Sequence, residues 1–401
     1  MKNNFYVNIV MVVFFLSAAS VFVSSVAIYQ TISIMRGESL EHTSSQSTPE
    51  SLRANDSSEY LAASAGSEAS PYASEEMIVP EQDPQLLVFG SIPYWDQRRA
   101  ISVFKENVDV FDIISVFWYL LEEDGAISTY QYANEDGSLI DFAHEHGVKV
   151  LALIANLPED DVWDWERVDN VIRSDERRKQ HIADILALVE ERGFDGVKID
   201  YEFLRNSQTE DFTAFIEELA SELHDRDKLL AVAIHAQLPG GPSRGQDIPR
   251  LQSADILSFM TYDEHWDTSE PGPPASLPWV RRVVEYAISI GVDRQKIFMG
   301  IPLYGYDWPQ EGGDWGKARG IEYDEITRLA NKHDVEITYH PEATSPYFSY
   351  FENGIAHEVW FENSFSFDDK LRLAKELGVG GILFWRQGRE DGRVYDILLG
   401  E

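Results

Sequence analysis

From residue 86 to the C-terminus, short apolar runs alternate with longer amphipathic segments, and this alternation most constrains the fold. Segments such as 177–193 and 211–227 have the periodicity of helices. Continuous apolar strands that are joined by helices form parallel sheets covered on both faces. Eight such units predict an α/β protein with a (β/α)8 barrel, and a doubly wound open sheet is the alternative. The eight predicted strands are 86–94, 112–120, 148–155, 196–202, 229–236, 255–263, 297–305 and 380–385.

The longest interval between predicted strands separates the seventh from the eighth. Residues 336–363 in this interval alternate between apolar and polar side chains, as antiparallel strands do. We therefore predict a small α+β insertion at about residues 309–360, on the C-terminal face of the barrel. An insertion there would form one wall of a cleft.

The N-terminal segment predicts where the protein resides. Residues 6–29 contain no charged side chain, and a run of ~20 apolar residues can span a bilayer as a helix. We expect residues 1–36 to be a membrane anchor with Lys2 in the cytoplasm and the remainder outside; a cleaved signal peptide is the alternative. Residues 37–84 contain ten acidic residues and one Arg, which predicts a disordered acidic linker before a catalytic barrel at 85–401.

Charge and cysteine content exclude several classes of function. The formal net charge of −36 repels the phosphate backbone of nucleic acids, so we expect no nucleic-acid partner. The chain has no cysteine, which excludes disulfides, thiolate metal sites and cysteine nucleophiles.

The fourth predicted strand carries three ionisable residues near its end. Side chains alternate along a strand, so Lys198, Asp200 and Glu202 share one face, directed into the barrel. Closely spaced carboxyl groups can raise one pKa and leave the other group ionised, which suits glycosidic cleavage. A salt-bridge network that only fills the barrel is the alternative.

Other strand ends are also polar or aromatic. The sixth strand ends with Met260, Tyr262 and Asp263, and the tyrosine hydroxyl could hold a polar substrate group. The eighth ends with Trp385, which could stack on a sugar ring or pack in the core. The remaining substrate-binding candidates are Tyr94 and Tyr304, at the ends of the first and seventh strands.

Together these segments resemble glycoside hydrolase family 18, the chitinase family. The fourth strand matches the family pattern D-G-x-D-x-D-x-E from Asp195 to Glu202 except at Lys198, and Met260–Asp263 matches M-x-Y-D. The runs GIPLYGYDW (300–308) and GGILFWRQGRED (380–391) resemble the family's seventh and eighth strands. The runs FDGVKIDYE, TYDEHW and HEVWFEN are most similar to bacterial cell-wall branches, including spore-cortex N-acetylglucosaminidases.

The resemblance implies a mechanism. Glu202 would be the general acid and base, and the 2-acetamido group of the substrate would replace a protein nucleophile, with retention of configuration. Asp200 would orient the acetamido N–H, Tyr262 would hydrogen-bond the same group, and Trp385 would stack beneath the sugar. No cofactor or metal would be needed. We expect a monomer acting on β-linked N-acetylglucosamine polymers such as peptidoglycan or chitin-like chains.

One position departs from the family pattern. Lys198 stands where the family has its middle Asp, and we expect this cation to favour the ionised form of Asp200. Lys198 and Asp195 are therefore predicted to tune the active site. Because of this departure, a non-hydrolytic, lectin-like protein on the same fold is the alternative to an enzyme.

Overall fold

The computed structural model describes residues 86–135, 137–158 and 162–400. The predicted anchor or signal segment at 1–36 and the predicted linker at 37–84 lie outside these residues. Within the described ranges, no helix is both long enough and apolar enough to cross a membrane.

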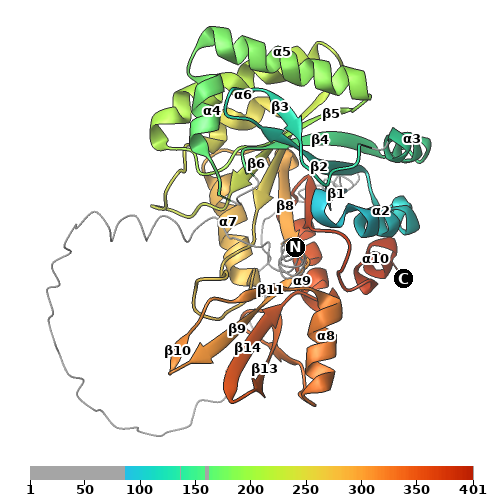
Figure 1. Ribbon diagram of the computed structural model, residues 1–401, viewed down its shortest axis with the longest axis vertical. Coiled ribbons are helices and arrows are strands. Elements are labelled where there is room, and N and C mark those ends of the chain that lie inside the picture. Colours follow the sequence, from blue (N-terminus) through green and yellow to red (C-terminus); the bar gives the residue numbers. More distant parts are fainter. Residues whose placement is uncertain (1–85, 136, 159–161, 401) are drawn as a thin grey trace, which may run out of the picture. The chain divides into compact units, whose positions relative to one another are not determined.

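A closed parallel barrel forms the centre of the described chain (Figure 1). Its strands follow the order β1-β15-β8-β7-β6-β5-β4-β2, and β1 also pairs with β2 in parallel. This last pairing closes the sheet, so the (β/α)8 prediction is confirmed and the open-sheet alternative is wrong. The barrel strands are β1 (Leu87–Pro93), β2 (Ile113–Leu121), β4 (Lys149–Ala155), β5 (Gly196–Asp200), β6 (Leu229–His235), β7 (Ile256–Met260), β8 (Ile297–Pro302) and β15 (Gly381–Trp385).

Helices surround the barrel, as Figure 1 shows. The two faces of each strand therefore meet different surroundings: one faces the helices and the other faces the barrel axis. The short strand β3 (Ile127–Thr129) extends the sheet by pairing antiparallel with β2. The helices are α2 (Gln97–Glu106), α3 (Gly137–Glu145), α4 (Trp165–Ile172), α5 (Asp175–Arg192), α6 (Thr209–His224), α7 (Leu277–Ser289), α9 (Ser364–Leu377) and α10 (Arg393–Leu399).

One layer inside the barrel shows how β5 differs from the other strands. Among the described residues, every barrel strand except β5 supplies an apolar side chain to this layer. On β5, the buried Lys198 occupies the inner face, with its ammonium nitrogen 5.4 Å from the centre of the Phe89 ring. The apolar members are Phe89, Ile113, Leu151, Ala231, Ile256, Phe298 and Leu383.

The predicted insertion lies between β8 and β15 and spans residues 305–361. It contains a six-stranded antiparallel sheet and one helix, α8 (Tyr323–Lys332), which packs on the sheet through Ile326 and Ala330. It begins at Gly305, four residues before the predicted boundary, because β9 continues almost directly from β8. Its strands are β9 (Gly305–Glu311), β10 (Asp314–Trp315), β11 (Arg319–Ile321), β12 (Thr338–His340), β13 (Ser345–Glu352) and β14 (Ile355–Phe361).

Candidate active site

The end of β5 brings two carboxyl groups together inside the barrel. Asp200 and Glu202 are both buried, at 7% and 6% exposure. The alternate residues face the helices, where the Tyr201 hydroxyl lies 2.7 Å from His181 on α5. The inner face of this strand therefore ends in two acids, with Lys198 beneath them.

Burial raises the pKa of both acids, and the charge of Asp200 raises that of Glu202 further. Burial raises the pKa of Asp200 to about 6, against the opposing effect of the Lys198 ammonium. Burial, and then the negative charge of Asp200, raise the pKa of Glu202 well above its usual value. Desolvation thus outweighs the expected effect of Lys198, which reduces the rise at Asp200 without reversing it. The result is a pair in which Asp200 ionises first and Glu202 keeps its proton to higher pH.

Asp200 also presents an unsatisfied acceptor. Its Oδ1 is buried and accepts no hydrogen bond from the residues that the structure describes. Buried acceptors without a partner are costly and uncommon, so each calls for an explanation. A donor on a bound ligand would satisfy this oxygen.

Asn156 fixes the backbone of Glu202 from the neighbouring strand. Its Nδ2 donates to the Glu202 carbonyl oxygen at 3.0 Å, and the Glu202 N–H donates to Asn156 Oδ1 at 2.8 Å. Asn156 directly follows β4 and is fully buried. Sequence reasoning missed this residue, although a polar residue after an apolar strand is the signal that singled out Glu202.

Tyr262 reaches the two acids from the segment after β7. Burial raises the pKa of the Tyr262 hydroxyl well above its usual value, and the charges of Asp200 and Glu202 add to the rise. The tyrosine ring packs against Gly300 of β8, where an added Cβ would lie 2.8 Å from a ring carbon and 2.4 Å from the Phe259 carbonyl oxygen. A side chain at position 300 would therefore displace the tyrosine.

Asp263 connects the barrel with the insertion. It adopts a left-handed backbone conformation with φ of 58°, and its Oδ1 accepts hydrogen bonds from Tyr304 and Tyr306 at 2.6 and 2.8 Å. Tyr304 thus directs its hydroxyl to Asp263, and Tyr306 of β9 is a second partner that sequence reasoning missed. Met260 is half-buried at the last position of β7.

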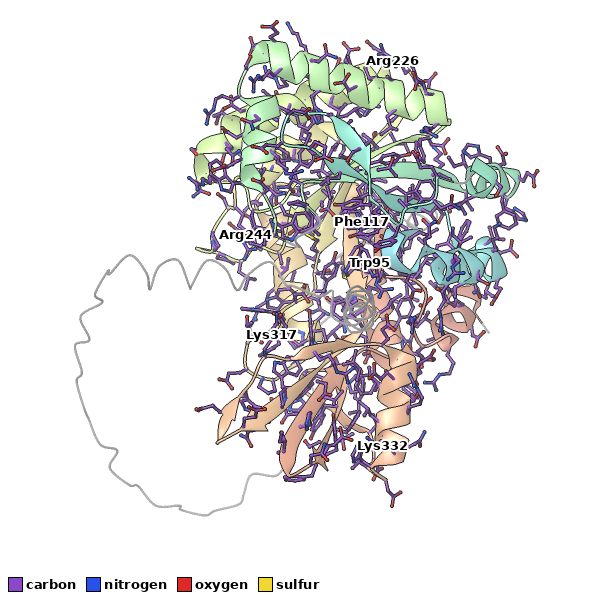
Figure 2. The ribbon with its side chains drawn as sticks, viewed as in Figure 1. Trp95, Phe117, Arg226, Arg244, Lys317 and Lys332 are labelled. Atoms are coloured by element: carbon purple, nitrogen blue, oxygen red, sulfur yellow. The ribbon has the colours of Figure 1, made fainter. Side chains whose placement is uncertain are left out.

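Aromatic side chains gather at the C-terminal end of the barrel. Trp385 is partly exposed and lies edge-on to Trp95 at 6.2 Å, with Phe117 at 6.1 Å. Figure 2 shows Trp95 and Phe117 close together, and their rings are 5.7 Å apart. Tyr94 stacks on Tyr130 at 4.2 Å, so one face of its ring is covered by the protein.

The structure does not bring Asp195 to this group. Asp195 precedes β5, at the opposite end of the strand from Glu202. Its Oδ2 accepts the Val150 N–H at 2.8 Å and lies 2.8 Å from His144 Nε2. The first contact ties β4 to the start of β5 and the second ties α3 to it, at the N-terminal end of the barrel. They give Asp195 a role in strand pairing, which differs from the tuning role predicted for it.

Two further residues near Glu202 were missed. His235 is the last residue of β6, and its Nε2 lies 3.5 Å from Glu202 Oε2. Arg244, in the loop that follows, has its guanidinium 3.4 Å from His235 Nδ1. Strand alternation could have indicated His235, because Ala231 faces the barrel interior and His235 lies four positions later on the same face. Among the described residues, no cluster of three or more His, Asp or Glu side chains could hold a metal ion.

Sequence comparison places this site in a known family. The family model described as "Glycosyl hydrolases family 18" matches residues 93–390, and this range contains every residue of the site. The chain belongs to glycosyl hydrolases family 18. Family 18 enzymes are glycoside hydrolases, and the family resemblance stated from the sequence is confirmed.

Relatives from spore-forming bacteria are among the most similar proteins. YdhD of Bacillus subtilis is 32% identical over 68% of this chain and 65% of its own length. The cortical fragment-lytic enzyme of Bacillus anthracis is 29% identical over 72% of this chain and 66% of its own. The chain thus spans slightly less than two thirds of these relatives. The crystal structure of the Bacillus megaterium spore cortex-lytic enzyme SleL superimposes with a TM-score of 0.70 at 25% identity, over 78% of this chain and 73% of that one.

We predict that Asn156→Ala lowers kcat by about a hundredfold, because a displacement of about 1 Å at the acid costs this much. The change removes both hydrogen bonds that fix the Glu202 backbone. Steady-state kinetics on a soluble chitooligosaccharide would measure kcat. The control is Asn170→Ala, since Asn170 donates one surface hydrogen bond, to the Glu123 carbonyl oxygen. Equal kcat for the two variants would contradict a positioning role for Asn156.

Proposed function

We propose that this protein is a retaining glycosidase that hydrolyses β-linked N-acetylglucosamine polymers, with Glu202 as general acid and base. The observation that carries the proposal is the ordered pair of acids in a family 18 barrel. Glu202 holds its proton to higher pH than Asp200, whose pKa is about 6. Near neutral pH, one group can donate a proton while its neighbour carries a negative charge.

The proposed reaction uses an acetamido group of the substrate. Glu202 donates its proton to the glycosidic oxygen as the bond to the anomeric carbon breaks. The carbonyl oxygen of the 2-acetamido group attacks the same carbon from the other face and forms an oxazolinium ion. Glu202 then removes a proton from the water that opens this ion, and the configuration is retained. Because the substrate supplies the nucleophile, only sugars with an N-acetyl group can be substrates.

The neighbouring side chains suit this reaction. An acetamido N–H would satisfy the unpaired Oδ1 of Asp200, and the ionised carboxylate would stabilise the positive charge that develops on the acetamido group. The Tyr262 hydroxyl lies near both acids and can hydrogen-bond the acetamido oxygen. Trp385, beside Trp95 and Phe117, offers an aromatic surface for the sugar ring.

We favour peptidoglycan as the polymer. Two observations support this choice: the relatives named above include a cortical fragment-lytic enzyme and a spore cortex-lytic enzyme. A lectin-like role is the second candidate. It is favoured by Lys198, which stands where the family pattern has an aspartate. Retention of both Asp200 and Glu202 favours the enzyme.

We predict that Glu202→Gln lowers the release of reducing ends by about 10²–10⁴-fold, because the amide cannot donate the catalytic proton. The full chain would be incubated with peptidoglycan, chitooligosaccharides and poly-N-acetylglucosamine. Glu222→Gln on the surface is the matched control. If Glu202→Gln and the wild type release reducing ends equally, hydrolysis by this residue is excluded. Binding of the same glycans by the wild type with no release of reducing ends would instead support the lectin.

We predict that activity rises with pH as Asp200 ionises, near pH 6, and falls at higher pH as Glu202 loses its proton. Lys198→Met removes a positive charge that lowers the pKa of Asp200, so the acid limb of kcat/KM should move to higher pH. Lys149→Met, at an exposed position on β4, is the control. An acid limb that stays in place would show that Lys198 does not set the protonation of Asp200.

We also propose that residues 6–29 anchor the protein in the membrane with the barrel outside the cytoplasm. The support is the sequence alone, an uncharged run of sufficient length. We predict that the full chain fractionates with membranes and that the barrel is cleaved by protease added to intact protoplasts. A protein released into the medium with a new N-terminus would instead identify a cleaved signal.

A further inference from the structure

His235 faces Glu202 across the interior of the barrel. β5 and β6 pair in parallel with Ile199 opposite Val232, so continuing this register places Glu202 level with His235. The His235 Nε2 lies 3.5 Å from Glu202 Oε2, and the two side chains are only 7% and 8% exposed. This distance is longer than a hydrogen bond, and Nε2 is a buried atom without a hydrogen-bond partner among the described residues. Contacts of this kind in catalytic sites are often long without substrate and tighten when substrate binds.

Arg244 decides which nitrogen of His235 carries the proton. A guanidinium has N–H donors and no acceptor, and it is protonated at any working pH. Its NH1 approaches His235 Nδ1 at 3.4 Å, so Nδ1 must accept and the imidazole proton must reside on Nε2. Burial, and then the Arg244 charge, lower the pKa of His235 to about 3, so the ring is neutral in the working range. A neutral ring with a proton on Nε2 directs an N–H at Glu202.

The loop after β6 holds Arg244 in place. Arg244 has a left-handed backbone with φ of 50°, which is uncommon for a residue with a side chain and persists only where the surroundings impose it. Gln246, 1% exposed, accepts the His235 N–H at 3.0 Å and donates to the Ala233 carbonyl oxygen at 2.8 Å. The guanidinium also lies 5.6 Å from the centre of the Phe203 ring, directly after Glu202.

Arg244 makes no ion pair with a carboxylate within 4 Å among the residues that the structure describes. Its effect on Glu202 is therefore long-range and passes across the intervening imidazole. The Arg244 charge lowers the pKa of Glu202, against the stronger effect of burial. Among the described residues, its guanidinium makes one polar contact, with His235.

We propose that His235 is a positioning residue that donates its Nε2–H to Oε2 of Glu202, and that Arg244 fixes the imidazole tautomer this donation requires. With Oε2 occupied as an acceptor, the catalytic proton of Glu202 resides on Oε1. The acid is then held in one orientation, with a single oxygen available to the glycosidic bond. This inference rests on the proposed role of Glu202 as the acid.

The protonation of Glu202 depends on several groups, and only two of them belong to this arrangement. The N–H of His235 and the charge of Arg244 both favour the ionised carboxylate, whereas Asp200 and Asp263 disfavour it. Removal of Arg244 should leave the pKa of Asp200 unchanged, because that pKa is shifted by burial and by the charge of Lys198. The charged and titratable groups that face Glu202 are Lys198 and Asp200 on β5, His235 on β6, Arg244 in the following loop, and Tyr262 and Asp263 after β7.

The first test compares His235→Phe with His235→Gln in the full chain. Phenylalanine keeps a flat ring but has no N–H, and we expect kcat to fall by about a hundredfold with little change in KM. Glutamine can present an N–H toward Glu202, and we expect kcat within about tenfold of the wild type. His224→Phe is the control, because His224 lies at the end of α6 and contacts Asp255.

The second test measures pH profiles for Arg244→Gln. Loss of the positive charge should move the alkaline limb of kcat/KM, set by Glu202, to higher pH and leave the acid limb, set by Asp200, in place. A loss of structure would not move one limb alone. Arg226→Gln is the matched control, since Arg226 pairs with Glu190 and Glu222 at the surface and lies far from Arg244 in Figure 2.

The outcomes separate this inference from the proposed function. If Glu202→Gln retains full activity, the role of Glu202 itself is wrong. If Glu202→Gln is inactive while His235→Phe keeps the wild-type kcat and Arg244→Gln keeps both limbs, only the positioning role is overturned. If His235→Phe does not fold, His235→Gln and Arg244→Gln still decide: unchanged pH limbs in Arg244→Gln overturn the proposal, and a shift of the alkaline limb alone supports it.

Discussion

The site depends on the desolvation of two carboxyl groups inside a closed barrel. Closure by the pairing of β1 with both β15 and β2 removes water from the interior, so Asp200 and Glu202 cannot ionise as they would at a surface. Burial is the largest cause of the raised pKa at each of them. Nearby charges then separate the two: the negative charge of Asp200 raises the pKa of Glu202, while Lys198 opposes the rise at Asp200.

Rigid contacts from four different strands hold this pair. Asn156 after β4 fixes the Glu202 backbone, His235 on β6 faces its carboxyl group, and the ring of Tyr262 after β7 packs on Gly300 of β8. Parallel strands in a barrel all end at the same face, so residues distant in sequence meet there. The acids therefore lie in a preorganised setting, which is what electrostatic stabilisation of a transition state needs.

Asp263 connects the insertion to the part of the barrel that surrounds the two acids. Its carboxylate receives the hydroxyl groups of Tyr304, after β8, and Tyr306, in the first strand of the insertion. The aromatic cluster of the insertion, which includes Trp308 and Trp360, packs against Trp385 of the barrel. Side chains of the barrel and of the insertion therefore both contact the aromatic surface proposed for sugar binding. The position of this surface depends on the short connection from β8 to β9.

The amino-acid sequence by itself determined the eight apolar strands, the insertion and the inward face that carries Lys198, Asp200 and Glu202. These features follow from local periodicity, since alternation along a strand fixes which side chains share a face. The sequence predicted a closed barrel with an open sheet as the alternative, and the pairing of β1 with β2 decided between them. Only the tertiary structure decided the partners of Glu202, because Asn156 and His235 reach it through strand register and Arg244 reaches His235 through the conformation of the following loop. It also decided that Asp195, five residues before Asp200, belongs to the other end of the barrel, and that burial outweighs the charge of Lys198 at Asp200. Desolvation depends on what the whole chain packs around a group, and that quantity has no local signature in the sequence.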